Sequence, residues 1–174
     1  MTKPVTVVEP TFQTVLAAYQ LQTETRDDGT KVIDFGTIEV DNNQDVDQLE
    51  AYGLGRFDKR VTAENFPSEK QGKIMVPLKL VNMGKSAQMP AIVSAIKQHA
   101  PRGGNIFELL VIHKRFPELA KWLFIVALES QVTDHHGNPL VSVLYRYGDR
   151  CGVCLYCCRE GWSHDFDIWF VAAG

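Results

Sequence analysis

The last third of the chain has the most regular pattern of apolar and polar positions. Apolar side chains recur at every second position in three runs, 122–132, 140–147 and 165–172. A period of two predicts β-strands that turn one face toward a core. Residues 150–159 are apolar at neighbouring positions, as expected of a central strand. Because short turns rich in Gly and charged residues separate these runs, we predict a four-stranded antiparallel meander over about 122–172.

The first two thirds of the chain contain helical spacing and two further strand patterns. Apolar residues three and four positions apart predict helices within 10–22, 90–99 and 105–116, with one short helix near 46–52. Strands are predicted at 31–40 and 73–81, and Pro77 favours an edge position for the second because it cannot donate to a ladder. Helices that precede a meander predict an α+β fold, in which the four strands pack on two or three helices.

Length and charge limit the class of protein. The chain has 174 residues, 45% hydrophobic and 22% charged, so we expect a single domain over 1–174 and exclude a disordered chain. The formal net charge of −3 excludes a globally basic protein, so nucleic acid is not an expected partner. An acidic, loop-rich region at about 24–69 holds nine acids between 24 and 50, against Arg26 and Lys31. This region predicts either a solvated surface or a surface for a basic protein partner.

The cysteines and the hydrophobic runs bear on the compartment. All four cysteines lie within 151–158, too close together to link distant parts of a secreted fold. The longest uncharged apolar run, 122–128, has seven residues, whereas a membrane span needs about 20. The N-terminus lacks the apolar core of a signal peptide. We therefore expect reduced thiols, a cytoplasmic location and no membrane partner.

The same cysteines are candidate metal ligands. Thiolates at Cys151, Cys154 and Cys157 could hold a zinc ion if His164 completed the shell. However, side chains alternate along a strand, so Cys151 and Cys157 would face one way and Cys154 the other. Free cysteine also packs as a small hydrophobic residue. The pattern favours packing, and we expect no cofactor, with zinc as the alternative.

Arg102, Gly103 and Gly104 precede a predicted helix and form a candidate anion site. Backbone amides at a helix start, together with a guanidinium, can bind a negatively charged group. The alternative is structural, because glycine commonly ends one helix and Asn105 can cap the next.

Two loops carry histidines and carboxylates. Asp134, His135 and His136 lie in one loop, and His164 and Asp165 lie in another. In the predicted meander both loops fall at the same end of the sheet, where they could form an enzyme active site or a small-ligand pocket. Exposed polar turn residues are the simpler interpretation.

The outward face of the predicted sheet is the main candidate binding surface. Carboxylates, a guanidinium and a Trp would share this face: Glu129, Gln131, Arg146, Asp165, Asp167 and Trp169. Such side chains suit a ligand groove or a partner surface. We therefore expect a non-enzymatic binding or protein-interaction domain that uses this face and the acidic region. The enzyme or ligand pocket and the small Cys/His metal site are the alternatives, and the oligomeric state stays open.

Overall fold

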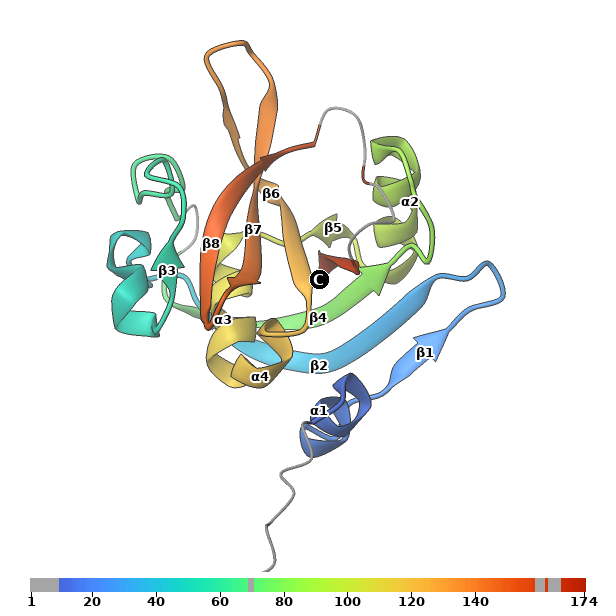
Figure 1. Cartoon of the computed structure of the whole chain (residues 1–174). Helices are drawn as coiled ribbons and strands as arrows, with labels where there is room; N and C mark the ends of the chain where they lie inside the picture. Colours follow the sequence, from blue (N-terminus) through green and yellow to red (C-terminus); the bar gives the residue numbers. More distant parts are fainter. Residues whose placement is uncertain (1–9, 69–70, 159–161, 163–166) are drawn as a thin grey trace, which may run out of the picture.

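A computed structural model describes residues 10–68, 71–158, 162 and 167–174 (Figure 1). The strands are β1 (Thr23–Thr25), β2 (Lys31–Asp41), β3 (Gly55–Arg56), β4 (Lys73–Asn82), β5 (Arg102–Gly103), β6 (Phe124–Thr133), β7 (Pro139–Tyr147), β8 (Arg150–Cys157) and β9 (Ile168–Ala173). The helices are α1 (Phe12–Ala18), the 3-10 helix η1 (Val46–Tyr52), α2 (Met89–His99), α3 (Ile106–Arg115) and α4 (Pro117–Ala120). None of the helices in the described ranges is long and apolar enough to cross a membrane.

The strands form one mixed, nine-stranded sheet, so the predicted four-stranded meander on two or three helices is wrong. The sheet order is β1-β2-β4-β9-β6-β7-β8-β3, and β5 pairs with β9 off this path. Strands β6, β7 and β8 are consecutive and antiparallel, as predicted. However, β9 lies between β4 and β6, antiparallel to the first and parallel to the second. The physical reason is that all six residues of β9 are buried, which suits a strand covered on both faces.

The two early strands also belong to this sheet. Strands β2 and β4 pair antiparallel, and β4 then pairs with β9, so β4 is not the edge strand that Pro77 suggested. The pairing of β4 with β9 begins at Leu78, and the Pro77 carbonyl accepts from the amide of Gly174, the last residue. Pro77 therefore lies just outside the paired residues of β4 and β9, and the N–H that proline lacks is not missing from their ladder.

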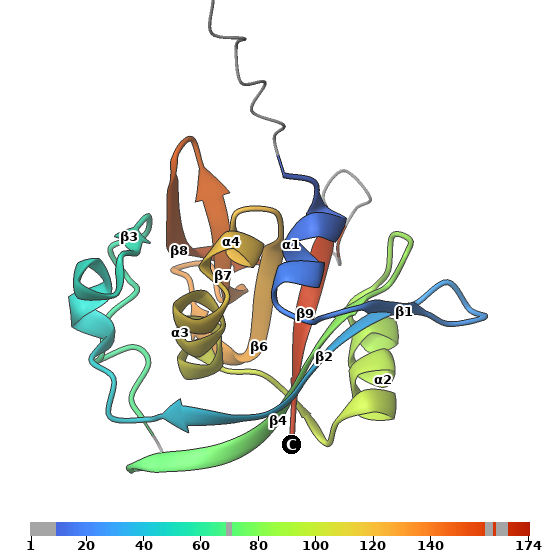
Figure 2. The same ribbon diagram turned by 90° about the horizontal axis from the view of Figure 1, so that it is seen from below.

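Helices cover both faces of the sheet, and β9 contributes to both cores. Trp169, Val171 and Ala173 pack in the cluster that contains α3, α4, α1 and η1. The alternate residues Phe170 and Ala172 pack in the cluster that contains α2. Figure 2 shows α3 and α2 on opposite sides of β9. The site described below lies where the start of α3 meets β5 and β6.

Candidate binding site at the start of α3

A bulge in β6 shapes this part of the molecule. Ala127 pairs with Ser142 on β7, but the next pair joins Gln131 to Val141, so residues 128–130 leave the ladder. The bulged segment reaches β5 instead. The amide of Glu129 donates to the Gly104 carbonyl at 2.9 Å, and the Glu129 carboxylate accepts from the Gly103 amide at 3.3 Å. As is common for bulges, the extra residues direct a side chain away from the regular sheet.

A buried ion pair joins β5 to α3. The Arg102 guanidinium donates to both carboxylate oxygens of Glu108, at 2.5 and 3.1 Å. The Glu108 side chain is only 1% exposed, and its carboxylate also accepts from the Asn105 amide at 2.6 Å. The carboxylate of Glu108 raises the pKa of Arg102 further above its ordinary value. A buried carboxylate requires such partners, because an unpaired charge in this position would destabilise the fold.

The backbone between β5 and α3 can approach β9 closely only because residue 104 is a glycine. A Cβ atom on Gly104 would lie 2.2 Å from Cγ1 of Val171 on β9. The close approach lets the Gly104 amide donate to the Val171 carbonyl at 2.8 Å.

The groups of the predicted anion site all have partners within the chain. Arg102 is paired with Glu108, and the amides of Gly103 and Gly104 donate as described above. At the start of α3, the Ile106 amide donates to the Ser130 hydroxyl at 2.6 Å, and the next two amides donate to the Asn105 side chain. The structure therefore gives no support to anion binding by Arg102, Gly103 and Gly104.

Two cavities flank this junction, and the types of residue that line them differ. We call the one with more polar lining residues the polar cavity and the other the apolar cavity. The polar cavity has a volume of about 310 Å³ and is lined by Asn42, Asn65, Phe66, Pro67, Ser68, Arg102, Asn105, Ile106, Phe107, Glu129, Ser130 and Gln131. The apolar cavity has a volume of about 360 Å³ and is lined by Met89, Val93, Ile96, Lys97, Pro101, Arg102, Gly103, Leu128, Glu129 and Gln131. Arg102, Glu129 and Gln131 line both cavities, and we call these three residues the wall.

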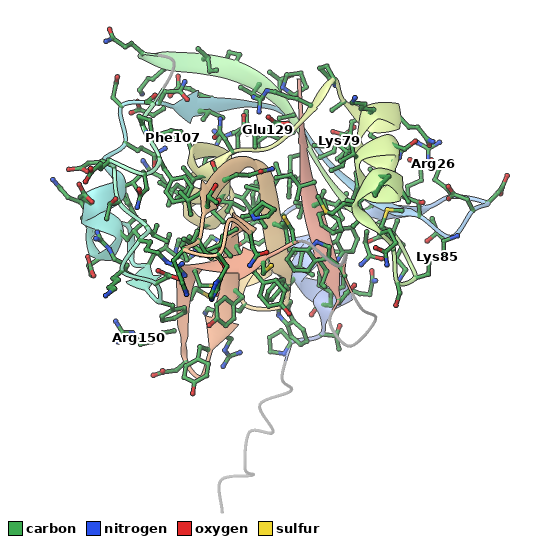
Figure 3. The ribbon with its side chains drawn as sticks, turned by 90° about the horizontal axis from the view of Figure 1, so that it is seen from above. Arg26, Lys79, Lys85, Phe107, Glu129 and Arg150 are labelled. Atoms are coloured by element: carbon green, nitrogen blue, oxygen red, sulfur yellow. The ribbon has the colours of Figure 1, made fainter. Side chains whose placement is uncertain are left out.

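The charges around the polar cavity favour a cation. Within the junction, Arg102 and Glu108 compensate each other, whereas Glu129 is exposed and adds a further negative charge. In Figure 3, Glu129 and Phe107, which line the same cavity, lie near the start of α3. The segment 41–68, which supplies Asn42 and Asn65, contains six acids and three basic residues: Asp41, Asp45, Asp47, Glu50, Asp58 and Glu64 against Arg56, Lys59 and Arg60.

The structure brings together only part of the predicted sheet face. Glu129 and Gln131 lie in the wall, next to Arg102, which the sequence had assigned to a separate site. Trp169 is 1% exposed and packs in the core on the α3 side, so it offers no surface. Arg146 is exposed but lies five positions along β7 from Val141, the partner of Gln131, and donates to the Gly148 carbonyl. The side chain of Asp167 accepts from Asn82, and Asp165 lies outside the described residues.

The cysteines lie on both faces of β8. Cys151 packs in the core on the α3 side, and Cys154 packs on the opposite side. All four cysteines are free thiols, and burial raises the pKa of Cys154 to about 12, so this thiol stays protonated. Over the part of the chain that the structure describes, no three His, Cys, Asp or Glu side chains are placed to hold a metal ion. His164, the predicted fourth ligand, lies outside that part, so the zinc alternative stays a prediction.

The first histidine loop is a hydrogen-bonded turn. Asp134 accepts from the amides of His136 and Asn138, both at 2.8 Å, and the Asn138 bonds hold the Asp134 pKa at about 2. His135 and His136 are exposed, with ring centroids 3.7 Å apart. The second loop, with His164 and Asp165, lies outside the described residues. The predicted meeting of the two loops therefore stays a prediction.

The sequence contains no signal for several residues of the junction. Ser130, Asn42 and Asn65 line the polar cavity, but each looks like an ordinary polar residue in the sequence. The pattern Asn105-x-x-Glu108 is a recognisable capping box, and it predicts the start of α3. It does not indicate that Glu108 is also the partner of Arg102.

Comparisons with protein-family models, with curated proteins and with solved structures find no match to this chain. Any function assigned to the chain therefore depends on the chemistry of its own residues.

Proposed function

We propose that this chain is a non-enzymatic protein-interaction domain that binds a basic segment of a partner protein at the polar cavity. The main observation is the Glu129 carboxylate, which is exposed between two cavities while the neighbouring charges of Arg102 and Glu108 cancel. A Lys or Arg side chain would place its cationic group against this carboxylate. The side-chain carbonyls around the cavity could accept its remaining hydrogen bonds.

The acidic region supports the same class of partner. Some of its carboxylates have local structural roles: Asp41 accepts from the Asn43 amide, and Asp47 accepts from the Ala63 amide. Asp47 also pairs with Arg56 and Asp58 pairs with Arg60, so part of the charge is compensated and the segment keeps an excess of three acids. The segment 41–68, which supplies Asn42 and Asn65 to the polar cavity, therefore carries an excess of negative charge, and its field would attract a basic segment and repel an acidic one.

We also propose that the protein acts in the cytoplasm. All four cysteines lie within residues 151–158, where none can link distant parts of the fold as the disulfides of a secreted domain do, and this supports a cytoplasmic location. A protein partner in the same compartment would meet the binding site without crossing a membrane.

Selection from a display library of random 12-residue peptides tests the proposed function without a known partner. The wild-type chain should enrich peptides with Lys and Arg. Glu129→Gln should lose this enrichment, because the amide keeps the shape of the side chain and removes its charge. Asp27→Asn is the matched control, since it removes one exposed charge from the β1–β2 turn, outside both cavities.

Two outcomes would contradict the proposal. One is a selected pool without an excess of Lys and Arg. The other is an excess that Glu129→Gln leaves intact, because the charge at the wall would then have no part in binding.

A further inference from the structure

Three side-chain amides that line the polar cavity are oriented by hydrogen bonds within the chain. Each donates its nitrogen to a main-chain carbonyl: Asn42 to that of Gly72 at 3.5 Å, Asn65 to that of Arg60 at 2.8 Å and Gln131 to that of Leu128 at 2.7 Å. Among the described residues, none donates a hydrogen bond to the side-chain oxygens of these three amides. The three oxygens are therefore left as acceptors for an occupant of the cavity.

The remaining polar groups of the lining add one more acceptor and few donors. One oxygen of the Glu129 carboxylate accepts from the Gly103 amide, and the other accepts from no group in the part of the chain that the structure describes. The fourth amide of the lining, Asn105, uses its oxygen to cap α3. Both terminal nitrogens of Arg102 donate to Glu108, and one also donates to the Gly103 carbonyl, so they do not compete for the free oxygens.

This set of acceptors matches a guanidinium better than an ammonium. Three amide oxygens and one carboxylate oxygen exceed the three N–H donors of an ammonium, whereas a guanidinium has five donors and no acceptor. The oxygens also belong to separate segments, since Asn42 follows β2, Asn65 precedes β4 and Gln131 is in β6. Donors spread over the three nitrogens of a planar guanidinium can reach such acceptors, whereas an ammonium presents all its donors from one atom.

We propose, on the basis of the function above, that the polar cavity selects Arg over Lys in the basic segment. The guanidinium pairs with Glu129 and donates to the oxygens of Asn42, Asn65 and Gln131. Methylation of that Arg weakens binding, because it keeps the positive charge and removes donors. The site thus distinguishes basic side chains by their number of donors as well as by their charge.

Four synthetic peptides test this preference. Each is a 12-residue Gly/Ser chain with three identical residues at its centre: Arg, Lys, asymmetric dimethylarginine or citrulline. Dimethylarginine keeps the charge of Arg but has only three donors, as Lys has, and citrulline keeps the shape without the charge. We expect the Arg peptide to bind about tenfold more tightly than the Lys and dimethylarginine peptides, as two further hydrogen bonds would give, and the citrulline peptide to bind most weakly. Titrations followed by fluorescence anisotropy give the dissociation constants.

Removing one of the free oxygens separates the number of donors from the charge. Gln131→Met keeps the length of an exposed side chain and removes its carbonyl, so the Arg-to-Lys affinity ratio should fall to about three while the affinity for the Lys peptide changes little. Gln98→Met is the control, because Gln98 is exposed on α2 and lies outside both cavities. Circular dichroism checks that both variants fold.

The outcomes distinguish this inference from the function on which it rests. Equal affinity for the Arg and Lys peptides, or a ratio that Gln131→Met leaves unchanged, would overturn the selection of Arg. If Glu129→Gln still weakened both peptides in that case, the basic partner would stand. If the citrulline peptide bound as tightly as the Arg peptide, or if none of the peptides bound, both proposals would fail.

Discussion

Helices α2 and α3 lie on opposite faces of one sheet, yet their surroundings differ greatly. Every residue of α3 from Ile106 to His113 is buried, because the sheet covers one side and α4 and neighbouring segments cover the other. Helix α2 buries only Ile92, Ala95 and Ile96 and exposes its outer face. A fully enclosed helix must pair the polar groups it contains, whereas a half-exposed helix can border an open cavity. The candidate site lies between the enclosed start of α3 and the exposed side of α2.

Breaking the ion pair between Arg102 and Glu108 should lower the free energy of unfolding more than the other changes described below. Arg102→Ala leaves the Glu108 carboxylate, which is 1% exposed, without its guanidinium, and we expect a loss of about 3–5 kcal/mol in the free energy of unfolding. Urea denaturation followed by circular dichroism measures this loss. Glu118→Ala is the control, because its pair with Lys121 is exposed and should contribute at most about 1 kcal/mol. Similar losses in the two variants would show that α3 is less enclosed than the structure indicates.

Shortening one apolar side chain on each helix sharpens the difference in packing. Leu109→Ala, on α3, removes a fully buried side chain and should cost about 2–5 kcal/mol. Val93→Ala, on the outer side of α2, should stay within about 0.5 kcal/mol. Ile92→Ala, on the inner side of α2, should behave like Leu109→Ala, because Ile92 is also fully buried. A large loss for Val93→Ala would mean that the outer side of α2 is covered in solution.

The histidines of the two helices, His113 and His99, should also differ in how strongly they make the stability depend on pH, and this effect should be smaller. Burial lowers the pKa of His113, on α3, below its ordinary value of 6.5, and its buried Nδ1 atom has no hydrogen-bond partner among the described residues. The folded state therefore favours neutral His113. Its contribution to stability is complete above about pH 6.5 and is lost as the pH falls toward the lowered pKa.

Variants of both histidines test this dependence. His113→Gln should flatten the decline of the urea midpoint between pH 7.5 and 5.5. His99→Gln, on α2, should flatten it less, because His99 is only partly buried although burial also lowers its pKa. If the urea midpoint of His113→Gln fell with pH as steeply as that of the wild type, a group other than His113 would cause the decline.

The sequence predicted the elements far better than their order. The helices at 90–99 and 105–116 and the short helix near 46–52 are present, because apolar spacing and end signals such as Asn105 are local. The place of β9 could not be predicted, since the period of a strand does not specify its neighbours. Because a tight turn was predicted before β9, this strand was expected at an edge of the sheet. Its six residues are all buried, and it lies in the centre.

The candidate site was predicted only in pieces. Arg102, Glu129 and Gln131 were all chosen as polar residues suited to binding, but they were assigned to two separate sites. The bulge at 128–130 unites them, and it depends on β5, on the start of α3 and on the Ser130 hydroxyl. These are contacts between distant parts of the chain, and the alternation of residues in β6 does not indicate them.

The smallest expected effect on stability concerns Glu129, and it separates binding from folding at the boundary between the two helices. Glu129→Gln should change the free energy of unfolding by no more than about 0.5 kcal/mol, because the side chain is exposed and its amide oxygen can still accept from Gly103. The same variant should lose the preference for basic peptides. A loss above about 1 kcal/mol would instead assign Glu129 a structural role like that of Glu108, since removing a needed charge-assisted hydrogen bond has a cost of that order. The open α2 side would then resemble the enclosed α3 side, and the contrast on which the binding site rests would disappear.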